Sequence, residues 1–351
     1  MKRWPTMPLG EICFAKSGNS KIIKGTLPTE NNGSMFPAYS ATGQDVFSDG
    51  FDFDGDGIVI SAVGARCGKC FLAKGKWRAI ANTHVILPKP DRANVRFLWY
   101  LLNDESFWVR GGTAQPFVKV GDSLKKQIAV PPLAEQERIV KLLDEADELR
   151  KIRGQADNRT AAFLPALFNE MIGNPLTNPK GWPIVLLNEV TSPKQWPTIT
   201  QEQLTESGFP VYGANGRIGF YSEFNHAEAT VLVTCRGATC GTVNVCEPKS
   251  YVTGNAMSLD NPNPAVLNVP YLESVLRVRG VKDTITGTAQ PQITRQSLAR
   301  VSFPVPPLPL QKEFAQRVTE IRELEAKQAA SRQRLESLFQ SMLHRAFNGE
   351  L

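Results

Sequence analysis

The sequence predicts an α+β protein: two tandem mixed-β modules, each followed by a long helix, the two helices forming an antiparallel coiled coil with pseudo-twofold symmetry. Three observations lead to this fold class. The chain has 351 residues, more than an ordinary domain of about 100–200 residues. It contains an internal repeat. Each copy of the repeat ends in a long polar segment in which apolar residues recur every three or four positions.

The repeat consists of paired sequence blocks in the same order and at nearly constant offset. Residues 36–43 (FPAYSATG) return as residues 209–216 (FPVYGANG), and residues 58–68 return as residues 231–241. The chain is therefore a duplication of one module-plus-helix plan. The remaining pairs are residues 4–12 with 182–190, 112–116 with 287–291, and 130–133 with 305–308.

Each module is predicted to be a twisted sheet with one or two small helices. Short β-branched and apolar runs alternate with clusters of Gly, Pro, Asn and Asp, and residues 95–109 and 271–278 have helical spacing. Residues 52–57 (DFDGDG) imitate the start of a calcium loop, but Val63 stands where that loop needs Glu, so we predict a hairpin turn. The clearest strand runs are residues 58–60, 85–87, 231–234 and 243–245.

A long amphipathic helix follows each module. Residues 135 to about 168 predict one helix with a kink at Pro165, and residues 311 to about 347 predict a second. A helix of about 35 residues spans roughly 50 Å, and its narrow apolar stripe stays wet unless the other helix or a partner covers it. The stripe positions include Ile139, Leu142, Leu143, Leu149, Ile152, Phe314, Val318, Leu324 and Leu338.

These patterns predict four segments. Residues 1–134 form the first module and residues 135–173 the central helix, while residues 174–309 form the second module and residues 310–351 the C-terminal helix. An antiparallel helix pair would place the two modules at opposite ends.

Positive charge is concentrated on the modules. The chain carries a net charge of +6, and residues 1–134 alone hold 17 basic and 11 acidic side chains. The second module is nearly neutral, with 10 basic and 9 acidic side chains in residues 171–309. The helical segments are balanced, which is typical of protein-binding faces, whereas basic modules suit an anionic partner such as nucleic acid. Ordinary solubility is the competing explanation for this surplus.

Several classes of protein are excluded or disfavoured. No apolar run of about 18 residues could cross a bilayer, and the N-terminal residues do not resemble a secretory signal. Six cysteines are too few for a disulfide scaffold and suit the cytoplasm. Cys67 and Cys70 have metal-like spacing but no second pair, so buried thiols are expected. The three histidines, His84, His226 and His344, have no triad neighbours in the sequence, and no phosphate-binding loop or methyltransferase motif is present.

Taken together, the sequence resembles the specificity subunit of type I restriction-modification systems over its whole length. The most specific segments are residues 130–140 (VPPLAEQERIV) and the tail at residues 335–347 (LESLFQSMLHRAF), together with the repeated Trp-Pro start and Gly-Thr-Ala-Gln-Pro block of each module. The second copy departs at residues 307–313 (PLPLQKE), which lose the first Glu. The chain is also compact for this family.

The resemblance implies two target-recognition domains, each reading one half of a bipartite, asymmetric site in double-stranded DNA. It implies helices that set the gap between the half-sites and hold two methyltransferase subunits, with restriction subunits in the full complex. It implies no catalytic activity and no cofactor in this chain, because S-adenosylmethionine, ATP and Mg belong to the partner subunits. Helices of roughly 50 Å are long enough to hold two target-recognition domains one helical turn of DNA apart, a distance of roughly 34–36 Å.

Candidate DNA contacts are basic and amide side chains on turns and on segments where the two copies diverge. Arg66 and Arg236 follow the central strand of each copy, and a solvated loop arginine is the alternative explanation. Thr42 and Asn215 occupy matching turns, for which structural turn chemistry is the simpler interpretation. Gln115 and Gln290 lie in a block common to both copies, which favours a role in the fold or at phosphate over base reading. The divergent segments add Lys16, Lys21, Lys24, Lys69, Lys76, Arg78, Lys194 and Arg217, with Trp77 and Trp196 expected to pack in the core.

Two other functions remain open at the level of sequence. A stand-alone DNA-modifying enzyme would turn over without partners. A coiled-coil adaptor would never touch DNA, and steep salt-dependent binding of duplex DNA by the partner-bound complex would argue against it.

Overall fold

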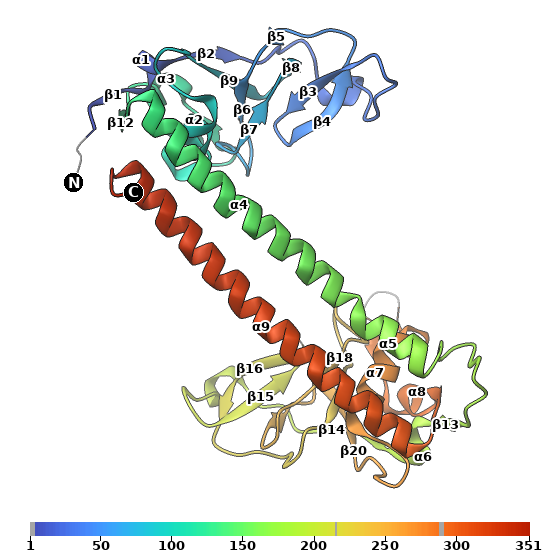
Figure 1. Ribbon diagram of the computed structural model, residues 1–351. Coiled ribbons are helices and arrows are strands. Elements are labelled where there is room, and N and C mark those ends of the chain that lie inside the picture. Colours follow the sequence, from blue (N-terminus) through green and yellow to red (C-terminus); the bar gives the residue numbers. More distant parts are fainter. Residues whose placement is uncertain (1–3, 215, 288–290) are drawn as a thin grey trace. The chain divides into compact units, whose positions relative to one another are not determined.

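The computed structural model describes residues 4–214, 216–287 and 291–351 and divides the chain into two compact units (Figure 1). The first unit comprises Met1–Arg153 with Ser331–Leu351, and the second comprises Gly154–Ala330. Each unit therefore contains one module and one portion of each long helical segment. Asn215 and Gln290, two of the predicted DNA contacts, lie outside the described residues.

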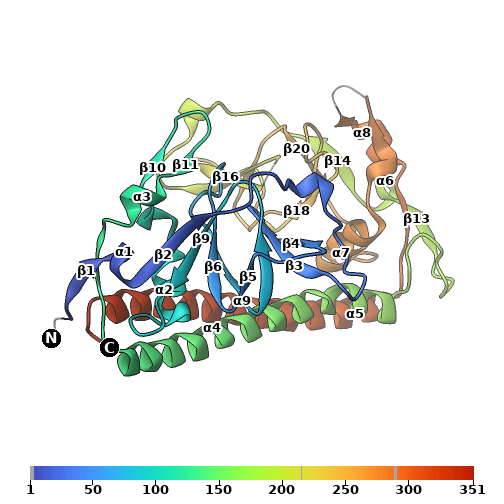
Figure 2. The same cartoon turned by 90° about the horizontal axis from the view of Figure 1, so that it is seen from above.

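Two four-stranded sheets form the first module (Figure 2). The central strands are apolar and fully buried, as the run at residues 58–60 predicts. The first sheet has the order β2 (Cys13–Ser17), β9 (Thr83–Pro88), β6 (Gly57–Ser61) and β7 (Cys70–Ala73). The second has the order β4 (Gly43–Ser48), β3 (Phe36–Ser40), β8 (Lys76–Ala79) and β5 (Phe53–Asp54).

The second module repeats this topology, so the duplication seen in the sequence is confirmed. It lacks only a counterpart of β5 among the described residues. Its four-stranded sheet has the order β14 (Ser192–Gln195), β20 (Ala256–Asp260), β17 (Val231–Thr234) and β18 (Val243–Val245). Its second sheet has the order β16 (Gly216–Tyr221), β15 (Phe209–Gly213) and β19 (Tyr251–Val252).

Smaller elements are duplicated in the same way. The matching two-stranded pairs are β1 (Thr6–Pro8) with β12 (Gln127–Ala129) against β13 (Ile184–Leu186) with β23 (Ser302–Pro304), and β10 (Arg110–Gly111) with β11 (Phe117–Val118) against β21 (Ile285–Thr286) with β22 (Gln292–Ile293). The matching short helices are α1 (Leu9–Ile12) with α6 (Leu187–Val190), and α3 (Val120–Ser123) with α8 (Arg295–Ala299).

One local prediction holds only in part, and another is wrong. The helix expected over residues 95–109 is α2 (Val95–Leu102), because Asp104 accepts the amide of Ser106 and starts a separate 3-10 turn at Glu105–Phe107. Its counterpart α7 (Val269–Arg279) includes the predicted residues 271–278. The segment 52–57 is not a hairpin turn, since β5 pairs with β8 while β6 pairs with β7 and β9.

The first long helix is interrupted, whereas the second is continuous. Residues 135–168 were expected to form one kinked helix, but α4 (Leu133–Ala161) ends before α5 (Phe163–Met171) begins. Pro165 lies in the first turn of α5, where its missing N–H is tolerated, and its ring would clash with the carbonyl of residue 161 in an unbroken helix. The C-terminal helix α9 (Leu308–Phe347) is unbroken over 40 residues.

The two helical segments pack antiparallel within each unit. In the first unit Arg138 donates to the carbonyl of Leu351 at 2.9 Å, and Arg150 lies 2.6 Å from Glu336. In the second unit Gln328 donates to Thr160 at 2.9 Å, while Phe168 of α5 contacts Phe314 of α9. In both units, residues later in one helix therefore meet residues earlier in the other.

The helices leave part of their apolar stripe uncovered. Ile139, Leu143, Phe314 and Val318 are buried in the core clusters of the modules, whereas the other helix or a partner was expected from the sequence to cover them. Four other stripe residues are not covered by either helix: Leu149, Ile152, Leu324 and Leu338 have exposed fractions of 55%, 52%, 41% and 54%.

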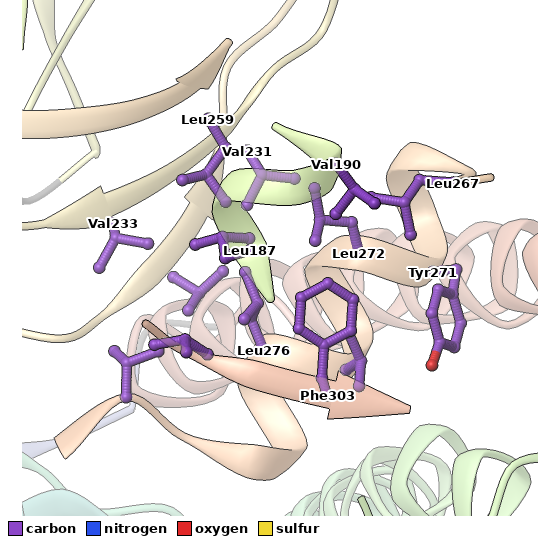
Figure 3. Close-up of a cluster of buried hydrophobic side chains, with 14 of the residues drawn as sticks. Leu187, Val190, Val231, Val233, Leu259, Leu267, Tyr271, Leu272, Leu276 and Phe303 are labelled. Carbon is purple, nitrogen blue, oxygen red and sulfur yellow. The ribbon is translucent and has the colours of Figure 1, made fainter. Parts of the chain in front are cut away.

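The core of the second unit shows how a module is joined to its helices. Leu187 and Val190 of α6, Val231 and Val233 of β17, and Tyr271, Leu272 and Leu276 of α7 converge in one cluster with Phe303 of β23 (Figure 3). Phe168 and Phe314 belong to the same cluster, so α5 and α9 share the core of the sheet.

Candidate nucleic-acid interface

One edge of the first module gathers most of the turns that connect its strands. Ser61 pairs with Thr83 and Ser17 pairs with His84, so β6 and β2 end where β9 begins. β3 runs parallel to β8, which places their carboxyl ends together. We call this the loop edge of the first unit, and it comprises residues 18–24, 40–43, 62–69, 80–82 and 111–117.

Backbone hydrogen bonds hold these turns against one another. Gly64 donates its amide to Pro116 at 2.8 Å, Ala62 donates to Asn82 at 2.9 Å, and Ala81 donates to Ile22 at 2.9 Å. The edge is therefore an ordered surface, although its turns are far apart in the sequence.

The second unit has an equivalent loop edge. Ile293 donates its amide to Cys235 at 2.9 Å, Arg236 and Gln292 form an isolated bridge, and the hydroxyl of Thr234 donates to Ala214. This edge comprises the described residues among 195–198, 213–216, 235–242, 253–255 and 286–292. Within the described residues, the duplicated scaffold thus brings equivalent segments together in both units.

Six predicted contacts lie on the loop edge of the first unit, and three do not. Lys16 lies within β2 opposite Val85, and its ammonium is 5.7 Å from the ring centroid of Phe53. Lys76 begins β8 at the opposite edge of the module, 4.9 Å from the ring centroid of Phe51. Arg78 is paired with Asp52 at 3.1 Å. The six on the edge are Lys21, Lys24, Thr42, Arg66, Lys69 and Gln115.

Lys24 and Thr42 already have a partner in the protein. The ammonium of Lys24 donates to Thr42 at 2.9 Å and lies 2.5 Å from Asp45. Burial favours a raised pKa for the Asp45 carboxyl, but hydrogen bonds from Lys24, Thr42 and Ser40 outweigh it and lower the pKa. A phosphate must compete with this carboxylate for Lys24.

Asn82 was not among the predicted contacts, although the structure brings it to the same place. It is exposed, adopts a left-handed backbone conformation with φ 65°, and lines the hollow that Lys24 and Thr42 also line. Its alignment with Asn255 at the same offset is the signal that singles it out.

Arg66, Lys69 and Arg236 differ from Lys24 because no ion-pair partner is found for them within the described part of the chain. Arg66 and Arg236 are exposed in the turns after β6 and β17, and Lys69 is half-buried beside Arg66. Such cations are available to an anionic ligand at no cost in broken ion pairs.

In the second unit two predicted cations pack on aromatic rings. The ammonium of Lys194 lies 3.5 Å from the ring centroid of Trp196. The guanidinium of Arg217 lies 4.4 Å from the ring centroid of Phe220 and 4.0 Å from Glu247. Both residues stand on strands near the loop edge, in β14 and β16 respectively.

The two tryptophans have different environments. Trp77 is fully buried, stacks on Phe53 at 4.4 Å and donates to the carbonyl of Gly55, so its predicted place in the core is confirmed. Trp196 is half-buried and donates to both Ser258 and Asp260 at 3.1 Å.

The block shared by both copies builds a hairpin at the loop edge of the first unit. Gly112 has φ +80°, and a Cβ there would lie 2.4 Å from the carbonyl oxygen of Gln115. The side chain of Gln115 is exposed. This hairpin explains why the block is common to both copies without requiring a base contact.

Close approach also restricts Gly18. A Cβ at this position would lie 2.2 Å from the Thr83 hydroxyl and 2.3 Å from the Ile80 carbonyl oxygen. We expect Gly18→Ala to lower the free energy of unfolding by about 1–3 kcal/mol, the cost of overpacking. Gly25→Ala is the matched control, because its Cβ would meet nothing within 4 Å. Equal denaturant midpoints for the two variants would contradict this.

Neither the cysteines nor the histidines form a reactive centre in the described residues. Cys67 and Cys70 are buried as expected, and burial raises the pKa of Cys70. The ring of His226 contacts Asn225 at 2.7 Å and Asp260 at 3.0 Å, and Asp260 is an acidic neighbour that lies far from it in the sequence. Both ring nitrogens are thereby used, and no nucleophile adjoins them. The described residues contain no group of three potential metal ligands.

The pair of His226 and Asp260 makes the second unit sensitive to acid. Burial favours a raised pKa for Asp260, but hydrogen bonds from His226, Ser258 and Trp196 outweigh it and lower the pKa. A lowered carboxyl pKa contributes stability above its ordinary value of about 4, and this is lost as pH falls through the folded-state pKa. Urea unfolding from pH 7 to about pH 3 should therefore show a steeper loss for the wild type than for Asp260→Asn. Parallel pH profiles would contradict this.

Comparisons with known proteins agree with this arrangement. A family model described as the type I restriction modification DNA specificity domain matches residues 1–158 and 179–336. The chain belongs to this family. It carries two DNA specificity regions of the type I restriction-modification kind in tandem.

A curated relative and two solved structures of this specificity family are similar to the chain in sequence or in fold. The chain is 28% identical over 143 residues to a protein of Haemophilus influenzae named as a type I restriction enzyme specificity subunit, and the alignment covers 39% of this chain and 36% of that relative. The fold is similar to the crystal structure of a type I restriction-modification S subunit from M. genitalium, with a TM-score of 0.66, 17% identity, and coverage of 98% and 96%. A structure concerning complex assembly in the type I system has a TM-score of 0.61, 20% identity, and coverage of 100% and 99%.

Within the described residues of this specificity protein, every helix is too short or too polar to span a bilayer.

Proposed function

We propose that each loop edge reads one half of a bipartite, asymmetric sequence in double-stranded DNA. The observation that carries the proposal is the duplicated edge itself: its described turns are equivalent in the two units, but some of them, such as those after β6 and after β17, carry different side chains. Arg66 and Lys69 occupy it in the first unit and Arg236 in the second, and all three lack an ion-pair partner among the described residues. A shared scaffold with divergent tips suits two readers of different sequences.

We further propose that the long helices set the gap between the half-sites and bind two methyltransferase subunits, with restriction subunits joining the full complex. The exposed apolar residues Leu149, Ile152, Leu324 and Leu338 support a protein partner on these helices. The chain needs no cofactor under this proposal: S-adenosylmethionine, ATP and Mg would be bound by the partners, which carry out the chemistry in the cytoplasm.

The distribution of charge along the chain favours DNA binding that is shared between this protein and its methyltransferase partners. The surplus of positive charge lies almost wholly in residues 1–134, and the helical segments are balanced. The isolated chain should therefore bind DNA weakly, and the methyltransferase subunits should supply the remaining DNA contacts. Tight, sequence-specific binding by the purified chain alone would contradict this part of the proposal.

The decisive experiment is methylome sequencing of cells with and without the protein. We expect methylated adenines in one split motif to disappear when the protein is removed. An unchanged methylome would overturn the proposal. Methyl transfer or DNA cleavage by the purified chain with Mg²⁺ and S-adenosylmethionine would instead favour a stand-alone enzyme.

A further inference from the structure

A buried glutamine stands at the start of each long helix, and neither is explained by DNA contact. Gln136 of α4 and Gln311 of α9 are both 0% exposed. Burying a primary amide is costly unless all of its polar groups are hydrogen-bonded. Each glutamine therefore needs a specific set of partners.

The two glutamines make the same three hydrogen bonds. In the first unit the Gln136 side-chain oxygen accepts the amide of Asn94 at 2.8 Å, and its nitrogen donates to Arg92 at 3.0 Å and to Pro131 at 2.8 Å. In the second unit the Gln311 oxygen accepts the amide of Asn268 at 2.9 Å, and its nitrogen donates to Val266 and to Pro306, both at 2.8 Å.

These bonds join three segments of each unit at one point. The donors and acceptors are backbone groups of the proline segment that enters the long helix and of the loop that begins α2 or α7. Asn94 is itself held in place, because its side chain caps α2 by accepting the amides of Arg96 and Phe97. The start of the long helix is therefore tied to the start of the module helix.

A second tie lies further along each long helix. In the first unit Asp144 of α4 accepts from Arg96 at 2.5 Å and from Tyr100 at 2.6 Å. In the second unit Arg322 of α9 donates to the buried Glu273 of α7 at 2.7 Å. Two hydrogen-bonded contacts along one long helix fix both its position and its rotation on the module. Of these two contacts, the one made by the glutamine has the same chemistry in both units.

We propose that Gln136 and Gln311 are positioning residues that fix the angle between each module and its helix, and thereby set which gap between half-sites the protein accepts. This proposal rests on the proposed function. One base pair of B-DNA shifts a half-site by about 3.4 Å and turns it by roughly 35°, so tolerance of a wrong gap requires the helix to tilt or rotate on its module.

The test measures methylation by the assembled methyltransferase complex on duplexes whose half-sites are separated by the native gap, or by one base pair more or fewer. The variants are Gln136→Met and Gln311→Met, which keep side-chain volume but remove the hydrogen bonds. Gln136→Glu is a second variant that keeps the acceptor for Asn94 and loses the amide donors. Gln316→Met is the matched control, because Gln316 is exposed on α9 five residues after Gln311.

We expect the ratio of wrong-gap to native-gap methylation to rise about tenfold in the Gln136 and Gln311 variants, which is within the roughly 100-fold rate change that a misplacement of about 1 Å can cause. The control should keep the wild-type ratio, and half-site sequence preference should stay unchanged in all variants. A uniform loss of methylation at every gap, or an unchanged ratio in folded Gln136 and Gln311 variants, would overturn the positioning role of the two glutamines alone. Absence of split-site methylation by the wild-type complex would overturn the proposed function as well.

Discussion

We expect Arg66→Ala and Arg236→Ala each to weaken binding of the cognate duplex by the assembled methyltransferase complex. Both arginines are exposed on a loop edge, and neither has an ion-pair partner among the described residues. A bidentate contact to guanine would contribute about 1–3 kcal/mol of discrimination, or roughly 5- to 150-fold in affinity. Loss of such a contact would relax specificity at one base pair of the corresponding half-site.

Salt dependence distinguishes a base contact from a phosphate contact. If Arg66 or Arg236 neutralises a phosphate, its replacement should lower the slope of log K against log salt by about 1 and weaken all sequences alike. Titrations between about 50 and 200 mM salt on cognate and scrambled duplexes measure both effects.

Lys76→Ala is the matched control for these arginines. This substitution also removes one positive charge, but Lys76 lies at the opposite edge of the first module, beside Phe51. Its replacement should leave affinity nearly unchanged. An equal loss for Lys76→Ala, or no loss for either arginine variant, would show that the loop edges are not the reading surface.

Among the substitutions proposed for this protein, Phe314→Ala should cause the largest decrease in the free energy of unfolding. Phe314 is 1% exposed and lies 5.6 Å from Phe168 in a T-shaped arrangement, within the core cluster that joins α5 and α9 to the second module. Truncating a buried phenylalanine to alanine costs about 3–5 kcal/mol, since apolar contact is lost and a cavity remains. Urea unfolding, together with hydrogen exchange of peptides from residues 154–330, measures this loss.

Phe163→Ala serves as the comparison for Phe314→Ala. Phe163 begins α5 in the same unit but is 47% exposed, so its truncation should cost far less. Hydrogen exchange should rise in the second unit more than in the first after Phe314→Ala. Similar losses for both phenylalanine variants would mean that the junction of the helices with the module does not depend on this core.

The sequence by itself determined the duplication, the class of fold and the family. Blocks such as residues 58–68 and 231–241 repeat because each must build the same buried strand and Gly-rich turn. Periodicity was a sound guide to α9 because nothing in that segment opposes a continuous helix. It failed at Ala162, where the effect of Pro165 on the preceding turn decides between one kinked helix and two helices.

Only the tertiary structure decided which candidate residues lie together. Strand register brings Arg66 and Gln115 to one edge and leaves Lys76 at the other, and no local pattern in the sequence contains that register. Lys24 and Arg66 are both basic residues in the sequence, yet only the structure shows that Lys24 forms an ion pair with Asp45. Gln136 and Gln311 read as ordinary polar residues of a helix start, and only packing shows that both are buried and fully hydrogen-bonded, because burial depends on segments far away in the chain.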